Sequence, residues 1–280
     1  MSMIRNLGRT DRRVSAVGMG CWAIGGHFTL DGRNDGWGDV DDDQSVAAIG
    51  VALDLGASLF DTADAYGTGH SEEGLGRALK GRRQEAVIAT KFGYTYDESQ
   101  RALLATDVSP AYIDRANALS LRRLGTDYID LYQVHPGALS DDEADLAGEA
   151  LEKLAESGRI LAWGWSTDDA RSARRMLKFP HFAAIQQELN VLHDGPDMLA
   201  LCAETGLASL NRSPLAMGVL SGKFTADTQF DENDVRGAGH AWVKHFKNGR
   251  PTPEVLDRLS ALQDLLQTGG RTPAQGALGW

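Results

Sequence analysis

The stretch YIDLYQVHPGALSDDEADLAGEALEKLAESGRILAWGW, residues 128–165, holds one full repeat of the pattern that decides the fold. Residues 128–134 are a short apolar run, typical of a buried strand. Residues 142–157 have the apolar spacing of a helix, which Gly158 is placed to end. A second apolar run follows at 160–165. This order predicts two parallel strands of one sheet, joined by a covering helix.

The same alternation continues outward in both directions. Further strands are expected at 14–19, 58–60, 86–90, 182–187 and 207–210. Further helices are expected at 45–55, 72–80, 168–177, 197–204, 253–266 and from Ser109-Pro110 onward. Regular alternation of this length favours a closed α/β barrel of the (β/α)8, TIM type over an open doubly wound sheet.

The pattern stops one strand short of a complete barrel. Another helix begins at Thr272-Pro273, and the chain reaches Trp280 without an eighth apolar run. A barrel of seven strands leaves unpaired backbone groups along its seam. We therefore expect a single barrel domain over 1–280 that is either C-terminally incomplete, with the eighth strand missing, or closed in a way that the sequence does not reveal.

Composition limits the class of protein. The 280 residues carry a net charge of −11, which argues against nucleic acid or an anionic membrane as a partner. No run approaches the roughly 20 apolar residues of a membrane helix, and the N-terminus lacks a signal-peptide core. The two cysteines, Cys21 and Cys202, have no metal-ligand spacing. A reduced, cytoplasmic protein without a metal site is expected, either a monomer or a homo-oligomer.

Two motifs are misleading and two segments interrupt the alternation. Residues 18–23 fit GxGxxA, but no helix follows, so a Rossmann fingerprint is not expected. The acidic run at 39–43 lacks EF-hand spacing and suits a solvated face or a helix cap. Segments 27–43 and 225–250 are long and polar. The second is either a lid or a disordered insertion.

Ionisable and polar side chains follow the predicted strands where a buried strand would avoid them. They are Asp61, Lys91, His135 and Ser166, with Tyr66 in the loop after the first. Taken singly, each has an ordinary structural explanation, such as a solvated lysine or a turn aspartate. Catalytic groups of barrels lie at the C-terminal ends of the strands, so their equivalent positions point to one site.

Proton transfer to a developing alkoxide is the chemistry that unites these groups. The pKa of a free tyrosine is about 10, and the ammonium of Lys91 would lower the pKa of Tyr66. Asp61 would keep a lysine between apolar walls charged. His135 would orient a carbonyl oxygen by a hydrogen bond. A hydrolase or isomerase on the same fold would need paired carboxylates or a metal cluster, which these strand ends do not offer.

Four stretches of the chain resemble the aldo-keto reductase family. They are FDTADAYG at 60–67, ATKFG at 89–93, SLRRLGTDYIDLYQVH at 120–135 and SPLAMGVLSGK at 213–223. The resemblance extends from about residue 4 to 280. It implies an NADP(H)-dependent reductase of aldehydes or ketones on a (β/α)8 barrel. Tyr66 would be the general acid, and Asp61, Lys91 and His135 would complete the catalytic tetrad.

The resemblance also implies how the cofactor binds. Ser166 and Gln186 would hold the carboxamide, Trp22 would line the pocket or the cofactor edge, and Arg212 would stack on the nicotinamide, which Asp61 also borders. The pyrophosphate region would be contacted by Ser213, Leu215, Gly218, Lys223 and Arg236.

The chain departs from the family pattern in three places. Thr167 and Leu189 stand where Asn and Tyr are common. The segment that grips the 2′-phosphate is absent, so NAD(H) stays open beside NADP(H). The alternative to a reductase is a barrel that binds the cofactor without turnover and acts as a sensor or regulatory subunit.

Overall fold

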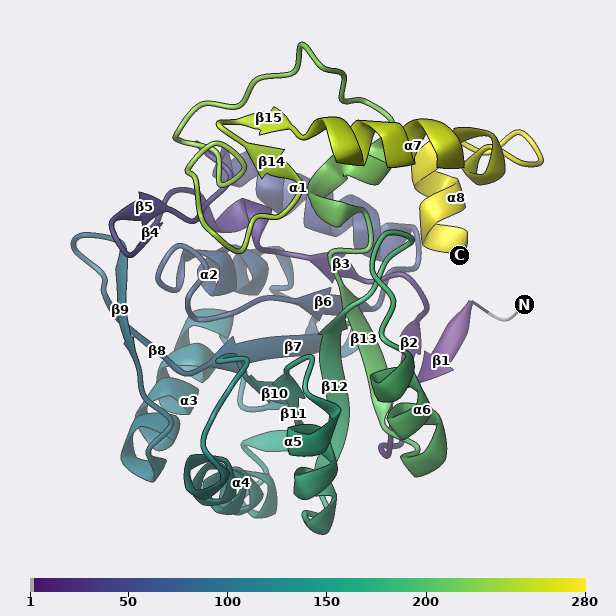
Figure 1. Ribbon diagram of the computed structural model, residues 1–280. Coiled ribbons are helices and arrows are strands. Elements are labelled where there is room, and N and C mark those ends of the chain that lie inside the picture. Colours follow the sequence, from purple (N-terminus) through teal and green to yellow (C-terminus); the bar gives the residue numbers. More distant parts are fainter. Residues whose placement is uncertain (1–2) are drawn as a thin grey trace.

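Seven parallel strands form one curved sheet in the order β13-β12-β11-β10-β7-β6-β3 (Figure 1). The computed structural model describes residues 3–280. The strands are β3 (Met19–Gly20), β6 (Leu59–Asp61), β7 (Val87–Phe92), β10 (Ile129–Val134), β11 (Ile160–Ser166), β12 (Phe182–Glu188) and β13 (Ala208–Arg212). The sheet therefore follows the predicted alternation, and within 3–280 no eighth strand joins β13 to β3.

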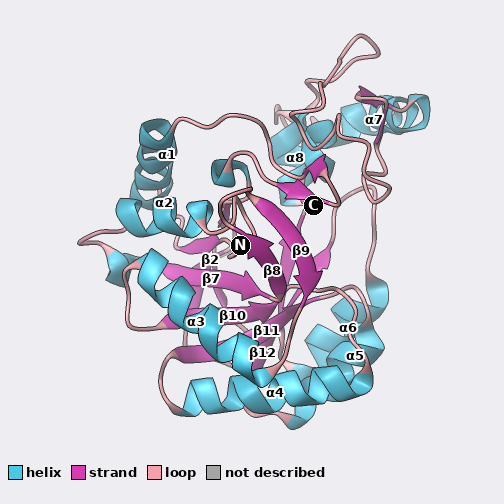
Figure 2. Cartoon of the chain, turned by 90° about the vertical axis from the view of Figure 1, so that its left-hand side faces the viewer, coloured by secondary structure: helices cyan, strands magenta, loops and turns pink. Residues whose placement is uncertain are grey.

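Helices cover the outer side of this sheet (Figure 2). They are α1 (Asp42–Asp54), α2 (His70–Ala78), α3 (Pro110–Leu124), α4 (Asp141–Glu156), α5 (Ala170–Arg175) and α6 (Pro196–Thr205). Local capping chemistry sets where they begin. Ser140 and Glu143 form a reciprocal capping box on α4, and Ser109 accepts from the third residue of α3. Asp169 caps α5 by accepting from the backbone N–H of Arg171.

Alternation along each strand separates two apolar layers. Leu131 and Ala162 lie in the cluster between the strands, inside the curve of the sheet. Their neighbours Tyr132 and Trp163 lie in the cluster formed with the helices. Because successive strand residues face opposite sides, continuous apolar runs are needed when both sides are buried.

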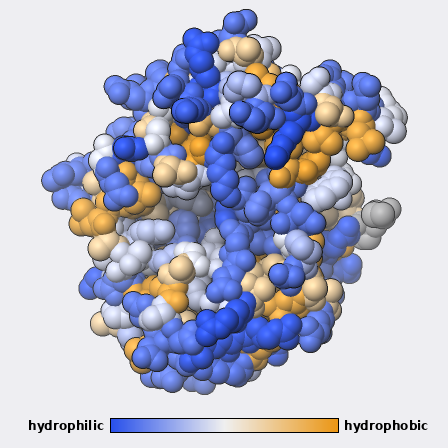
Figure 3. Space-filling model, viewed as in Figure 1, coloured by the Kyte–Doolittle hydropathy of each residue, from blue (hydrophilic) through white to orange (hydrophobic). Residues whose placement is uncertain are grey.

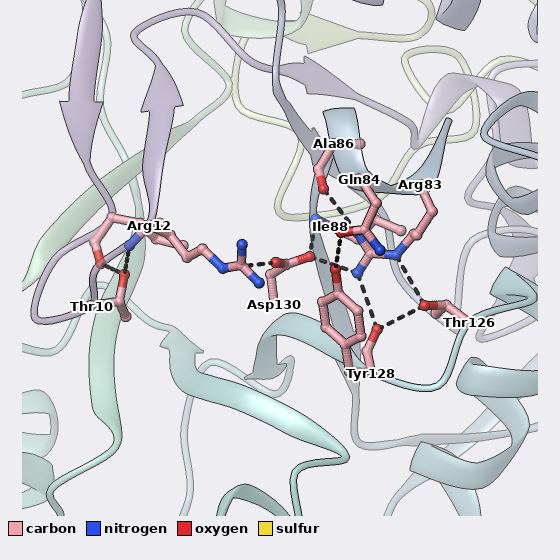
Figure 4. Close-up of polar contacts among 10 residues, drawn as sticks. Thr10, Arg12, Arg83, Gln84, Ala86, Ile88, Thr126, Tyr128 and Asp130 are labelled. Carbon is pink, nitrogen blue, oxygen red and sulfur yellow. Dashed lines mark hydrogen bonds and ion pairs between the residues drawn. The ribbon is translucent and has the colours of Figure 1, made fainter. Parts of the chain in front are cut away.

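A polar network holds the end of the barrel at which the strands begin (Figure 4). The Asp130 side chain is 1% exposed and lies 2.7 Å from Nη2 of Arg83 and 3.4 Å from Nε of Arg12. It also accepts from the backbone N–H of Ile88 at 3.0 Å. One carboxylate therefore connects β7, β10 and the N-terminal hairpin β1 (Ile4–Asn6) and β2 (Arg13–Ser15).

Three segments differ from the sequence-based expectations. The single strand expected at 14–19 is divided: β2 pairs with β1, whereas β3 joins the barrel. Segment 27–43 forms a hairpin, β4 (Thr29–Leu30) and β5 (Arg33–Asn34). A second hairpin, β8 (Tyr94–Asp97) and β9 (Ala102–Thr106), was not expected, and β9 pairs with β4. Each hairpin pairs locally across its turn, and the β9–β4 pairing joins the two hairpins.

Segment 225–250 is folded and lies over one end of the barrel (Figure 1). It ends in two short strands, β14 (Phe246–Lys247) and β15 (Arg250–Pro251), followed by α7 (Pro253–Leu266) and α8 (Pro273–Gly279). Its apolar residues form a separate cluster with α7 and with η4 (Ala216–Ser221). Backbone N–H of Val235 donates to Gly36 at 2.8 Å, which ties the segment to the β4–β5 region.

The surface in the view of Figure 1 is mostly hydrophilic, with separate hydrophobic patches (Figure 3). Among the described helices, none combines the length and the apolar character that a bilayer crossing requires.

Candidate active site

The carboxyl ends of neighbouring parallel strands bring the predicted catalytic groups together. Asp61 is the last residue of β6, Lys91 lies near the end of β7, and His135 follows β10 directly. Ser166 ends β11 and is in register with Gln186 on β12. Because the strands are parallel and adjacent, residues far apart in the sequence share one end of the sheet.

The ammonium of Lys91 lies at the centre of the site, with no side-chain exposure. Its Nζ is 2.6 Å from Oδ1 of Asp61, 2.9 Å from the carbonyl oxygen of Thr62 and 3.0 Å from Oη of Tyr66. An ammonium has three N–H donors, and all three are used. Burial acts to lower the pKa of Lys91, but Asp61 and Tyr66 outweigh burial and leave that pKa raised. The lysine is therefore charged when the site is formed.

Two amides hold the second oxygen of the Asp61 carboxylate. Nε2 of Gln186 donates to Oδ2 at 2.7 Å, and Nε2 of Gln133 donates to it at 3.2 Å. Charge-assisted hydrogen bonds of this kind fix the orientation of a carboxylate. Asp61 thus faces Lys91 by Oδ1 while its other oxygen is occupied by neutral donors.

Tyr66 remains a phenol in this environment. Burial raises its pKa, Lys91 acts in the opposite direction, and Asp61 raises the pKa further. The expected lowering by Lys91 is thus present, but burial outweighs it. A protonated phenol beside a buried cation is suited to donate its proton and to be stabilised afterwards as phenolate.

His135 faces the phenol edge-on, with ring centroids 5.6 Å apart. Burial, Lys91 and Arg212 hold the pKa of His135 well below its usual range, so the imidazole is neutral. Its Nδ1 is buried and has no hydrogen-bond partner among residues 3–280. A neutral imidazole carries one N–H, so His135 can act as a hydrogen-bond donor.

A close backbone contact between Gly67 and Gly25 helps to fix the position of the Tyr66 phenol. Gly67 has φ +62°, and a Cβ there would lie 2.0 Å from the carbonyl oxygen of Gly25. Only glycine suits both the left-handed backbone and this approach. On the same side, the indole of Trp22 stacks on Tyr66 at 6.0 Å between centroids. Trp22 therefore lies directly against the Tyr66 ring.

The residues expected at the cofactor carboxamide lie on adjacent strands. Ser166 and Gln186 supply a hydroxyl and an amide at paired positions of β11 and β12. Both are buried, at 8% and 5% exposure. These two side chains have the donor and acceptor groups that a carboxamide requires, so the site fits a nicotinamide.

The residues expected at the phosphates differ in how freely they could bind an anion. Ser213, Leu215 and Gly218 lie in the turn after β13, where Ser213 and Gly218 have positive φ. The Lys223 side chain is exposed and forms no ion pair among residues 3–280. A turn of this kind beside a free cation fits an anionic group.

The two expected arginines are already engaged. Nη2 of Arg212, at the end of β13, forms an ion pair with Asp168. Arg236 binds both carboxylate oxygens of Asp234 and lies 3.8 Å from the centroid of the Phe230 ring. To bind the cofactor, each guanidinium would have to give up its ion pair with a carboxylate. The sequence did not indicate these ion pairs.

Sequence reasoning missed three residues of the site. Gln133 shares a strand face with His135, so period-2 alternation could have indicated it. Tyr94 contacts His135 with centroids 5.2 Å apart, but it lies on the unexpected β8–β9 hairpin. Asp35 raises the pKa of Tyr66 through its charge, and no local pattern marks it.

A surface hollow of about 730 Å³ lies away from this group, between α5 and α6. Its lining includes Arg174, which is paired with Glu204, and Arg175, which is paired with Asp145. It is bordered by exposed ion pairs and contains none of the strand-end groups, so we do not assign the chemistry to it.

Comparison with known proteins agrees with this geometry. The sequence profile of the "Aldo/keto reductase family" matches residues 16–280. The NADP(+) aldo-keto reductase yakc of Schizosaccharomyces pombe is 31% identical over 95% of this chain and 76% of its own length. The NADH-specific methylglyoxal reductase of Escherichia coli is 33% identical over 98% of this chain and 84% of its own length.

Solved structures agree as well. An aldo-keto reductase of Bacillus halodurans, in its holo form, superimposes with a TM-score of 0.76 at 32% identity, covering 97% of this chain and 79% of the other. A glycerol dehydrogenase of Gluconobacter oxydans gives 0.80 at 31% identity, covering 97% and 80%. Neither these relatives nor the side chains gathered around Lys91 favour the alternative of a catalytically inactive sensor. This chain is an oxidoreductase that belongs to the aldo/keto reductase family.

Proposed function

We propose that the protein reduces a small aldehyde or ketone to the alcohol, with Tyr66 as proton donor. The observation that carries the proposal is the fully buried ammonium of Lys91, which lies 3.0 Å from the phenol oxygen and 2.6 Å from Asp61. A buried lysine needs a partner to remain charged, and here the same charge faces the phenol. This arrangement suits proton transfer from the phenol oxygen of Tyr66.

Three side chains of the protein have separate roles in the proton transfer. The substrate oxygen lies between the phenol of Tyr66 and the imidazole of His135. His135 donates a hydrogen bond that polarises the carbonyl, and Tyr66 transfers its proton as negative charge develops on the oxygen. Lys91 then stabilises the phenolate. When bound, the nicotinamide cofactor supplies the hydride to the carbonyl carbon.

The cofactor would be held along the strand ends. We assign Ser166 and Gln186 to the carboxamide, with Trp22, Asp61 and Arg212 bordering the ring. The phosphates are assigned to Ser213, Leu215, Gly218, Lys223 and Arg236. Relatives named for NADP(+) and for NADH support NAD(P)H in general, and NADP(H) is the form that we propose. We also propose that residues 1–280 form one barrel domain and act in the cytoplasm.

Replacing Tyr66 with Phe tests the proton donor. Steady-state oxidation of NADPH on a panel of aldehydes should fall about 10²- to 10⁴-fold, which is the usual contribution of general acid catalysis. Cofactor affinity, measured by quenching of protein fluorescence, should change little because the ring is kept. Tyr128→Phe, at the opposite end of the barrel, is the matched control. Parental turnover in Tyr66→Phe would remove Tyr66 from the mechanism.

A further inference from the structure

Asp35 lies beside the proposed proton donor, in the segment that follows β5. Its carbonyl oxygen accepts a 2.9 Å hydrogen bond from the indole N–H of Trp22, the ring that stacks on Tyr66. Its carboxylate raises the pKa of Tyr66 and also that of Tyr94, the second neighbour of His135. The backbone of Asp35 is therefore in direct contact with the ring that stacks on Tyr66.

The carboxylate of Asp35 lacks the partners that a buried group normally has. Its Oδ1 is buried without a hydrogen bond among residues 3–280, and 12% of the side chain is exposed. The nearest ring nitrogen, Nε2 of His240, lies 3.5 Å from Oδ1 but only 2.8 Å from the carbonyl oxygen of Asn34, to which it donates. Trp37, two residues further, has a buried indole N–H that is also unpartnered. Because buried polar groups are nearly always bonded, these atoms indicate a place for a ligand.

Aromatic rings enclose this region. The centroid of Trp22 lies 5.2 Å from that of Trp37 and 6.0 Å from that of Trp242, which belongs to segment 225–250. Trp242 stacks in turn on His240 at 5.4 Å. Such rings cover the C–H surfaces of a small organic molecule, while a carboxylate among them accepts hydrogen bonds from its polar groups.

Charge selects a neutral ligand. The Arg236 guanidinium lies 4.7 Å from the Trp37 ring centroid, and the ammonium of Lys91 lies below Tyr66, so cations already border the region. These cations would repel a cationic substrate, and the Asp35 carboxylate, when ionised, would repel an anionic one, so a neutral ligand is favoured. Burial, with a smaller contribution from Asp31, raises the pKa of Asp35 to about 7, so the carboxylate is mostly ionised in assays above that pH.

We propose that Asp35 is a specificity-determining residue that accepts a hydrogen bond from a hydroxyl group of the substrate, so that the enzyme prefers neutral hydroxyaldehydes and hydroxyketones to their deoxy analogues. This inference rests on the proposed reductase activity. In the proposed complex, a hydroxyl on the carbon next to the carbonyl bonds to the Asp35 carboxylate while the carbonyl oxygen faces Tyr66. The hydrogen bond would satisfy the unpartnered carboxylate.

The test compares two substrates that differ by one hydroxyl group. kcat/KM with NADPH is measured for 2-hydroxypropanal and for propanal in the parent, in Asp35→Ala and in Asp35→Asn. We expect the parent to favour 2-hydroxypropanal at least tenfold. Asp35→Ala should reduce that ratio about tenfold or more, as expected for the loss of a hydrogen bond to a carboxylate. Asp35→Asn, which keeps the shape and a weaker acceptor, should give an intermediate ratio.

Asp39→Asn is the matched control, because Asp39 is an exposed acid of the same segment. Its ratio should equal that of the parent. A parent without preference, a ratio that both Asp35 variants retain, or an equal loss on both substrates would overturn the inference while leaving the reductase proposal intact. Absence of turnover with any aldehyde in the folded parent would instead overturn the proposed function, and the inference with it.

Discussion

Replacing Lys91 with Met removes the charge on which the proposed proton transfer depends. By Coulomb's law, an ammonium 3.0 Å from the phenolate oxygen stabilises it by about 5.5 kcal/mol at an effective dielectric constant of about 20. With about half of the phenolate charge developed in the transition state, the loss is about 3 kcal/mol. Turnover should therefore fall about a hundredfold.

The fold should tolerate this change. Met is close to Lys in length and suits a buried position, and Asp61 keeps the two amide donors of Gln133 and Gln186. The Asp61 carboxylate loses its cation, so Tm should fall, while NADPH binding by the folded variant should stay close to the parent. Lys80→Met, at an exposed lysine, is the control for the loss of one positive charge.

The pH dependence of kcat gives a second measurement on the same variant. Without Lys91, burial and Asp61 act on Tyr66 unopposed, so the pKa of the phenol rises further. The alkaline decline in kcat, which follows ionisation of the proton donor, should move to higher pH. Parental turnover, or a decline displaced to lower pH, would refute the role given to Lys91.

Two further predictions concern stability. Asp64 is buried, neither of its carboxylate oxygens has a partner among residues 3–280, and burial, then Glu72, raises its pKa well above the usual range. The native state therefore holds this proton more tightly than the unfolded chain, so stability is lost as pH rises above about 4. Asp64→Asn should raise Tm more at pH 8 than at pH 5, and equal changes at both would contradict this account. Asp130→Ala leaves the Arg83 guanidinium without its buried partner and should lower the free energy of unfolding in urea by about 3 kcal/mol. Exposed Asp127→Ala is its control, and a loss no greater than that of the control would contradict the prediction.

The parts of the fold that depend on local chemistry could be predicted from the sequence. The apolar runs at 86–90 and 129–134 need burial on both faces, and caps such as Ser109 and Ser140 act on residues three positions away. These signals lie within a few residues of each other, so the order of strands and helices follows from them. The short hairpins pair locally across their turns, but β4 and β5 have only two residues each, too few to show a strand pattern, and β9 gains a further partner in β4.

The candidate site was predictable for a topological reason. Once the strands are parallel, Asp61, Lys91 and His135 must share one end of the sheet, whatever the loops do. The roles of the loop residues had no such constraint. Arg236 was expected at a phosphate, yet it is paired with Asp234 and stacked on Phe230.

The sequence by itself determined the barrel alternation and the identity of the groups around Lys91, because periodicity and capping are properties of neighbouring residues. Only the tertiary structure decided that burial outweighs Lys91 in setting the pKa of Tyr66, that Gln133 and Gln186 occupy Asp61, and that Asp35 lies unpartnered beside Trp22. Desolvation and hydrogen-bond partners depend on which distant segments come together, and that is fixed when the whole chain packs.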